Sequence, residues 1–426
     1  MQITQANISH LVRHLREQGA VMLLESQMRE HPSSTKSYLA GKPSASIKAY
    51  GDSIEIMEDG FSRSVKQNPW QALEEFRRRH NDWLFGYFGY DLKNYLEDLS
   101  SENGDVMGAP DLFFMKPEML FEIDQELNVH SIKGGLPGDL NTVENEWFID
   151  LQLSHRISES AYKKLIEQAK RDIYEGDYYE INLSHPLIFH FGGDSWSLYQ
   201  KMKETGPVPF GGYLHFDGFS ICCSSPERFL AKKRNLVWSQ PIKGTASRLK
   251  EIDSTNAIKA LLESEKERSE NLMIVDLVRN DLSRIAKKGS VRVRDLFEIQ
   301  SFETVHQMVS TVECEVEKES NVIELIKACF PMGSMTGAPK IAAMNSIDRL
   351  ENYKRGIYSG AMGYMNPDND FDFNVIIRSA LLKDQKLVYP TGGAITSDSD
   401  PAAEWEETLL KAKAITNIRE ITEAPE

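Results

Sequence analysis

Two short segments place a lysine and a glutamate close together in the sequence. Lys243 lies in Pro-Ile-Lys-Gly-Thr, and Glu227 lies in Ser-Pro-Glu-Arg-Phe just upstream. A lysine becomes a nucleophile when its ammonium group is desolvated or stands beside another cation, and burial can raise the pKa of a glutamate until it is an acid near neutral pH. We therefore expect a buried Lys243 with a lowered pKa, suited with Glu227 to displacing a hydroxyl group from a small substrate. The alternative is a surface lysine and a solvated glutamate.

Two pairs of glutamates have a spacing of three residues in stretches that favour a helix. Glu267 and Glu270 lie in the helical stretch 256–285, so both side chains project from one face. Glu404 and Glu407 lie in a second helix, which an Asp-Pro pair is expected to start. Carboxylate oxygens are ligands that Mg²⁺ prefers. Together the two helices could hold Mg²⁺, whereas either pair alone is typical of a solvated helix face.

Two glycine-rich segments could expose backbone groups to an anionic ligand. Residues 330–340 (FPMGSMTGAPK) precede a helix expected to begin near Pro339, and the N–H groups at a helix start favour an anion. Their spacing does not match a phosphate-binding loop. Residues 391–394 form a second turn, and Arg378 at the end of an apolar strand could pair with a carboxylate. His306 could carry a proton, although plain turns and a structural histidine are the alternatives.

The charge balance and the cysteines argue against several classes of protein. The 426 residues carry a formal net charge of −15, with a pI near 5.3. Nucleic acid is therefore not an expected partner, because binding its phosphates requires clustered Lys and Arg. The four cysteines lack the spacing of a zinc site. With no signal segment and no apolar run near the roughly 18 residues of a membrane span, we expect a cytoplasmic protein that does not bind a membrane.

The apolar pattern predicts two regions and an α+β fold. Residues 1–150 mix short helices and strands, and residues 151–426 form the expected catalytic region. A helix is expected over 159–175, with Ser158 as its N-cap and Gly176 as its stop. Strands are expected at residues 178–191, 212–223 and 235–240. Few helices separate these strands, so we expect a large two-lobed antiparallel or mixed β-sheet core flanked by helices.

Taken together, these segments resemble the chorismate-utilising enzymes. This family includes component I of anthranilate synthase, component I of aminodeoxychorismate synthase, and the isochorismate and salicylate synthases. The matching motifs follow the family's order over about residues 158–420. They are SPERF, PIKGT, KER followed by Glu270, IVDLVRNDL, FPMGSMTGAPK, IYSGAMGY, IIRSA, TGGAI and EWEET. The resemblance implies the family's fold and chorismate as the substrate, and residues 1–150 are similar to anthranilate synthase component I but match more loosely.

Within this family, the residue at position 243 distinguishes the reactions. Enzymes that aminate chorismate at C4 carry a lysine there, which is held to attack C2 while the equivalent of Glu227 protonates the departing 4-hydroxyl group. Anthranilate synthases carry alanine at this position. Isochorismate and salicylate synthases use a lysine to activate water where this chain has Glu180. The resemblance therefore implies formation of 4-amino-4-deoxychorismate, the precursor of p-aminobenzoate for folate, with anthranilate, isochorismate or salicylate formation as alternatives.

The resemblance also assigns residues to a metal ion and to the substrate. Glu270 and Glu407 would contact Mg²⁺ directly, with Glu267 and Glu404 behind them through water. His306 would lie near the enolpyruvyl group as a further catalytic residue. The residues that would bind the substrate are Thr245, Lys340, Tyr358, Arg378, Gly392, Gly393 and Ala394.

Partners and effectors follow from the same comparison of motifs. No cysteine lies in the glycine-rich turn of a glutaminase, so we expect ammonia from a separate glutamine amidotransferase subunit, component II. Ser26 and Pro207 lie in segments similar to those that bind tryptophan in related enzymes, which makes tryptophan a candidate effector. Asn271 and Val278 replace a histidine and a glycine that are usual in the family, but no catalytic group is lost. A catalytically silent protein that binds chorismate or tryptophan is the alternative from another class.

Overall fold

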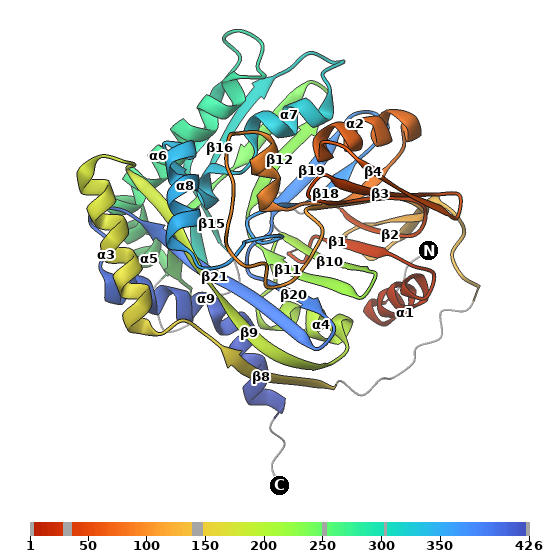
Figure 1. The fold of residues 1–426 in the computed structure, drawn as a ribbon, viewed down its shortest axis with the longest axis horizontal. Helices are drawn as coiled ribbons and strands as arrows, with labels where there is room; N and C mark the ends of the chain where they lie inside the picture. Colours follow the sequence, from red (N-terminus) through yellow and green to blue (C-terminus); the bar gives the residue numbers. More distant parts are fainter. Residues whose placement is uncertain (1–3, 29–35, 139–147, 249–253, 302–304, 423–426) are drawn as a thin grey trace.

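Local sequence signals set the ends of the helices in the computed structural model (Figure 1), which describes residues 4–28, 36–138, 148–248, 254–301 and 305–422. α3 (Glu159–Glu175) begins where Ser158 Oγ accepts a hydrogen bond from Ala161 N at 3.2 Å. It ends at Gly176, whose φ of 91° favours glycine. The prediction of this helix is confirmed at both ends.

One antiparallel ladder of strands forms the framework of the described chain. Its first half runs through β8 (Ile149–His155), β9 (Glu180–Gly193), β21 (Lys386–Ile395), β20 (Ser379–Lys383), β11 (Phe219–Ser225), β10 (Phe210–Phe216) and β1 (Val21–Glu25). Its second half runs through β2 (Ser37–Tyr50), β6 (Leu112–Ile123), β5 (Leu84–Phe88), β18 (Ala361–Met365), β19 (Phe371–Val375), β12 (Arg228–Lys233), β13 (Leu236–Gln240), β16 (Val305–Glu315) and β15 (Arg292–Ser301). Shorter strands extend it, namely β3 (Ser53–Glu58), β4 (Phe61–Lys66), β7 (Val129–Lys133), β14 (Ile242–Ser247) and β17 (Gly337–Ala338).

The two halves of the ladder enclose one core, and helices cover their outer faces. Met22 from β1, Phe85 from β5 and Leu214 from β10 pack together between the halves. One outer face packs against α2 (Pro69–His80), α6 (Glu265–Ser283) and α7 (Val322–Cys329), and the other against α1 (Gln5–Arg16), α4 (Ser195–Thr205) and α9 (Pro401–Thr422). α3 and α8 (Lys340–Leu350) lie side by side on the left in Figure 1 and share a smaller core. The predicted α+β class is confirmed, and none of the described helices is long and apolar enough to cross a membrane.

Two elements differ from those predicted. Residues 212–223, expected as one strand, belong to the hairpin of β10 and β11, because Asp217 and Gly218 take positive φ values of 45° and 79° in a tight turn. The helix expected over 256–285 is two helices, α5 (Ser254–Glu263) and α6. Ser264 separates them, since its hydroxyl accepts a hydrogen bond from Glu267 N and starts a new helix.

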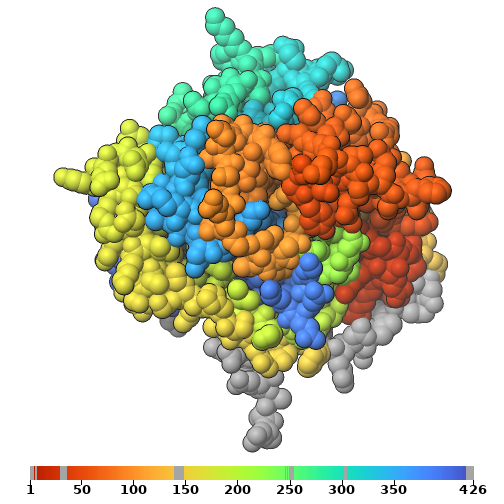
Figure 2. Space-filling model, in the orientation of Figure 1, coloured from red at the N-terminus to blue at the C-terminus, as the bar shows by residue number. Residues whose placement is uncertain are grey.

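Strands from the N-terminal region pair with strands from the middle and the last part of the chain. β1 pairs with β10, and β5 pairs with β18, where Leu84 lies opposite Met365. Figure 2 shows the same proximity at the surface, where orange N-terminal segments adjoin light-blue segments from the last third of the chain. The two predicted regions therefore share one sheet, and their boundary near residue 150 stays a prediction.

Arg355 ties several of these elements together inside the core. Its guanidinium group donates to both carboxylate oxygens of Glu351, at 2.8 and 2.6 Å. It also donates to Asn182 O on β9 and to Met335 O in the short helix η2 (Gly333–Met335), each at 2.7 Å. A weaker bond at 3.2 Å reaches Ser359 Oγ, just before β18. The ion pair is 1% exposed on either side, so it fixes β9, η2 and the start of β18 relative to one another.

His185 on β9 makes the stability of this fold sensitive to acid. Its buried ring stacks on Trp405 of α9, with centroids 5.7 Å apart, and burial lowers its pKa to about 4. The unfolded chain binds this proton near pH 6.5, so the contribution of neutral His185 is full above that pH and is lost as the pH falls toward 4. Replacing His185 by Gln should remove up to about 3 kcal/mol of this pH dependence, at roughly 1.36 kcal/mol per pKa unit.

Denaturant unfolding between about pH 7 and pH 4 measures this effect. His190→Gln serves as the control, because His190 is exposed on the same strand. A free energy of unfolding that falls equally steeply in wild type and His185→Gln would contradict the prediction.

Candidate active site

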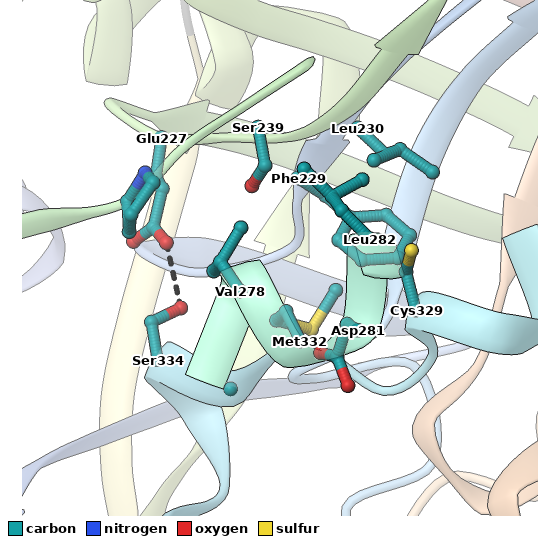
Figure 3. A pocket seen from close by; sticks show the side chains of 12 residues that line it. Glu227, Phe229, Leu230, Ser239, Val278, Asp281, Leu282, Cys329, Met332 and Ser334 are labelled. Carbon is teal, nitrogen blue, oxygen red and sulfur yellow. Dashed lines mark hydrogen bonds between the residues drawn. The ribbon is translucent and has the colours of Figure 1, made fainter. Parts of the chain in front are cut away.

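Glu227 is a buried carboxyl group immediately before β12. Its Oε1 accepts a hydrogen bond from Ser334 Oγ at 2.6 Å, drawn as a dashed line in Figure 3. Burial raises the pKa of Glu227 to about 7, although the Ser334 hydroxyl and the charges of Lys243 and Arg378 oppose the rise. A substantial fraction of Glu227 is therefore protonated near neutral pH, as a general acid requires.

The apolar wall beside Glu227 explains this pKa. Figure 3 shows a small cavity in which Phe229, Val278 and Leu282 lie opposite the polar groups of Glu227 and Ser334. Its volume of about 10 Å³ leaves room for no more than about one water molecule. Little water can therefore stabilise the ionised carboxylate, and the protonated form is favoured.

Lys243 on β14 is buried among carboxylates. Its Nζ donates to Glu180 Oε1 at 2.6 Å, and Glu270 Oε2 lies 3.9 Å away. Burial alone would lower the pKa of Lys243, but the charges of Glu180 and Glu270 outweigh it and raise the pKa above its ordinary value. The expectation of a lowered pKa is therefore wrong, because it considered burial without these acidic neighbours. In the absence of ligands Lys243 is an ammonium ion at neutral pH.

α6 and α9 bring the two predicted glutamate pairs close together. α9 starts as expected, since Ala402 N and Ala403 N donate to Asp400 Oδ1 at 3.1 and 2.8 Å. Lys266 Nζ on α6 lies 3.9 Å from Glu270 Oε1 and 3.9 Å from Glu404 Oε1, between the two helices.

The electrostatics of these four glutamates differ. Burial raises the pKa of Glu270 to about 7, and it also raises the pKa values of Glu267 and Glu404. At Glu407, burial is outweighed by the ammonium group of Lys411, which holds the pKa below its ordinary value. Clustered carboxylates repel one another unless a cation compensates their charge.

The carboxylate oxygens of these four glutamates are the kind of ligand that a hard divalent cation prefers. Glu404 Oε2 is buried and has no hydrogen-bond partner among the described residues. The Lys266 ammonium already places one positive charge between the helices. No three His, Cys, Asp or Glu side chains in the described ranges already surround a single point, so the carboxylates would have to turn toward an ion. The assignment of Mg²⁺ to Glu267, Glu270, Glu404 and Glu407 stays a prediction.

Part of the predicted substrate site adjoins these carboxylates. Gly392, Gly393 and Ala394 lie on β21, and a Cβ atom on Gly393 would lie 3.2 Å from Glu404 Oε2. Arg378 lies between β19 and β20 and forms no ion pair within the described part of the chain. Burial lowers its pKa despite the charges of Tyr389, Glu407 and Glu227. An uncommitted guanidinium group there is suited to a substrate carboxylate.

Two further predicted residues, Tyr358 and His306, are buried. Tyr358 lies beside Arg355, whose guanidinium carbon is 5.8 Å from the ring centroid, and burial raises the pKa of Tyr358 to about 12. His306 lies on β16, where its Nδ1 is 2.8 Å from Ser301 Oγ. Its Nε2 is buried without a partner among the described residues. The roles of Tyr358 and His306 stay predictions.

Thr245 and Lys340 are the other two residues predicted to bind the substrate. Thr245 lies on β14 opposite Gln307, and its side chain is outside the described part of the structure. Lys340 Nζ is held by Asp281 Oδ2 at 2.7 Å and by Cys329 O at 3.3 Å. Lys340 is therefore already paired, although its role in substrate binding stays a prediction.

The structure adds two residues that were not predicted for the site. Glu180 begins β9, two residues later than that strand was expected to begin, and holds Lys243. Lys411 Nζ donates to Gly392 O at 2.8 Å and pairs with Glu407 Oε1 at 2.7 Å. The position of Lys411 four residues after Glu407 was a usable signal, because such residues share a helix face. For Glu180, the signal was the resemblance, which places it where isochorismate and salicylate synthases have a catalytic lysine, but its contact with Lys243 had no local signal.

One of the two residues predicted for tryptophan, Ser26, lines a second cavity. This cavity of about 100 Å³ is lined by Ser26, Tyr38, Phe210 and Arg228, among others. Pro207 is not among its lining residues. Glu227 lines the small cavity of Figure 3 and its neighbour Arg228 lines this one, so the two side chains enter different cavities. Tryptophan as an effector stays a prediction.

A buried acid with a pKa of about 7 and a buried ammonium group held by carboxylates indicate an enzyme that acts on an anionic substrate. The chain matches the family model described as "chorismate binding enzyme" over residues 19–417 and belongs to that family.

Curated relatives carry two different names. Aminodeoxychorismate synthase component 1 of Escherichia coli is 30% identical over 417 residues, with 92% of each chain covered. Anthranilate synthase component 1 of Cereibacter sphaeroides is 32% identical over 376 residues, covering 79% of this chain and 73% of the relative. The probable chloroplastic aminodeoxychorismate synthase of Oryza sativa is 34% identical over 87% of this chain, which spans 48% of that protein's length.

A solved structure supports the same family. Anthranilate synthase component I of Streptococcus pneumoniae has a TM-score of 0.79 and 27% sequence identity. The match covers 91% of this chain and 93% of that one. Similarity therefore establishes the family but not which of the family's reactions this chain catalyses.

Ser334 provides a direct test of the properties of Glu227. Its hydroxyl donates to the carboxyl group and so favours the ionised form. Replacing Ser334 by Ala should raise the pKa of Glu227 by on the order of one unit. A ¹³C NMR titration of the carboxyl carbons measures this without turnover. Ser239→Ala is the control, since Ser239 lines the same cavity, and an equal shift in both variants would contradict the assignment.

Proposed function

We propose that this chain is component I of an aminodeoxychorismate synthase, which converts chorismate and ammonia into 4-amino-4-deoxychorismate. The observation that carries the proposal is the presence of a lysine at position 243, buried in the site and held 2.6 Å from Glu180. Glu227, with a pKa of about 7, supplies the acid in the same region. The Escherichia coli relative of that name, which matches over 92% of both chains, supports the proposal.

The proposed reaction has two substitutions. The Nζ of Lys243 forms a bond to C2 of chorismate while the C4–O bond breaks, and the proton of Glu227 goes to the departing hydroxyl, which leaves as water. Ammonia then forms a bond to C4, and the bond between C2 and Lys243 breaks. The ionised Glu227 can take a proton from the new C4 ammonium. Since Lys243 begins as an ammonium ion, it must lose a proton before it attacks, and Glu180 Oε1 is its nearest described acceptor.

Mg²⁺ would be held by Glu270 and Glu407, with Glu267 and Glu404 behind them, and would supply charge compensation for a substrate carboxylate. Arg378 and the backbone of Gly392 and Gly393 would orient the substrate carboxylates. The guanidinium group suits this role because it has no ion-pair partner among the described residues.

Anthranilate synthase component I is the second candidate, because relatives with that name are as similar as those that aminate at C4. Lys243 favours the first candidate: a lysine bonded to C2 blocks the carbon at which anthranilate synthesis adds nitrogen. Isochorismate and salicylate formation are less favoured, since Glu180 stands where those enzymes activate water. Ammonia would come from a separate glutaminase subunit, component II.

The product formed with ammonium salt tests the proposed function. We expect the purified chain to convert chorismate into 4-amino-4-deoxychorismate with Mg²⁺ and an ammonium salt at alkaline pH, where free ammonia is available. We expect no conversion with glutamine. Chromatography with mass spectrometry identifies the product. Anthranilate or isochorismate as the main product, or turnover with glutamine alone, would contradict the proposal.

Replacing Lys243 by Ala tests the covalent step. The variant should lose most of the C4 amination, on the order of 100-fold or more, and any remaining activity should shift to product aminated at C2. Wild-type protein quenched during turnover should carry chorismate-derived mass on the peptide that contains Lys243. Lys232→Ala is the control, because Lys232 is also a buried lysine but donates to Asn369 O, outside the proposed site. Formation of 4-amino-4-deoxychorismate by Lys243→Ala at the wild-type rate would rule out the nucleophile.

A further inference from the structure

Lys243 Nζ has two carboxylates within reach in the described structure. Glu180 Oε1 is at 2.6 Å and Glu270 Oε2 is at 3.9 Å. The Lys243 side chain is 10% exposed, so its ammonium group cannot exchange either carboxylate for bulk water. A buried charge must stay paired, and the present arrangement gives the close contact to Glu180.

The backbone of Glu180 is fixed by its neighbours, and its side chain is buried. It begins β9, is 1% exposed, and pairs with Ala338 of β17. Gly337 packs directly on the same backbone, since a Cβ atom added to Gly337 would lie 2.0 Å from Glu180 O. The lysine ammonium, by contrast, lies at the end of a flexible four-carbon chain. The position of Lys243 Nζ therefore follows from the position of Glu180.

Glu270 is the carboxylate that Lys243 would take if Glu180 were absent. Lys266 Nζ also lies 3.9 Å from Glu270, but its side chain is 50% exposed and can withdraw into solvent when a metal ion binds. The ammonium group of Lys243 is buried and cannot withdraw into solvent in this way. Without Glu180 its ammonium group would move onto Glu270 and compete with a cation for that carboxylate.

We propose that Glu180 is a positioning residue that keeps Lys243 Nζ off Glu270 and so leaves Glu270 free for the divalent cation. The proposal rests on the role that the proposed function gives to Glu270. It explains why an acidic side chain is buried at the start of β9, and it links the nucleophile to the metal-binding glutamates through one hydrogen bond.

Titration calorimetry with MgCl₂ alone, without chorismate, tests the link to the cation. Glu180→Ala should weaken Mg²⁺ binding on the order of tenfold, because the cation must displace Lys243 from Glu270. Glu180→Gln, which keeps the shape of the side chain, should weaken binding less and in the same direction. In a Lys243→Met background, the change at position 180 should have little effect. Equal weakening in both backgrounds, or none in wild type, would overturn the proposal.

A crystal structure of metal-free Glu180→Ala tests the positioning role separately. Lys243 Nζ should move from 3.9 Å to hydrogen-bonding distance from Glu270. In wild type and in Glu180→Gln, it should stay at the side-chain oxygen of position 180. An unmoved Nζ would overturn the positioning role even if the wild type makes the proposed product. If wild type binds no Mg²⁺ while Nζ does move, the metal assignment in the proposed function fails and the positioning of Lys243 stands. Thermal unfolding of each variant checks that it is folded.

Discussion

The geometry of the site depends on the buried ion pair of Arg355 and Glu351. This pair joins Asn182 O on β9 to Met335 O in η2, and Ser184 on β9 adds two hydrogen bonds to Glu351, at 2.7 and 2.8 Å. Removing one partner of such a pair costs about 3 to 5 kcal/mol, out of a total stability of about 5 to 15 kcal/mol for a typical domain. The strand that carries Glu180 and the turn that carries Ser334 are thus both held by this pair, in addition to the hydrogen bonds that join them directly.

Some charged groups in the site are paired within the protein, and others have no partner among the described residues. Lys243 is satisfied by Glu180, and Lys411 by Glu407 and a backbone carbonyl. Glu404 Oε2 and the Arg378 guanidinium group have no such partner among the described residues. A negatively charged substrate would pair with the arginine, and a divalent cation would pair with the carboxylate. Glu404 and Arg378 thus correspond in sign to the two ligands that the proposed reaction requires.

Much of the fold followed from local sequence signals, and much of the site did not. Ser158 and Gly176 set the ends of α3 through short-range hydrogen bonds and backbone conformation, so that helix was predicted correctly. The turn at Asp217 and Gly218 was missed because the apolar pattern continues on both sides of it. The raised pKa of Lys243 was missed for a different reason. It depends on Glu180 and Glu270, which lie on other elements and reach Lys243 only through tertiary packing.

The pairing of β5 with β18 has a consequence for how the chain is made. During synthesis, the edge of β5 that pairs with β18 stays without hydrogen bonds until the residues near Met365 have been made. At a synthesis rate of about 5 to 20 residues per second, the delay is on the order of tens of seconds. During this time the nascent chain carries an open strand edge rich in aromatic residues, with Phe85, Tyr87 and Phe88 exposed to wrong partners. The long-range ladder that assembles the site therefore makes the unfinished chain depend on protection from aggregation.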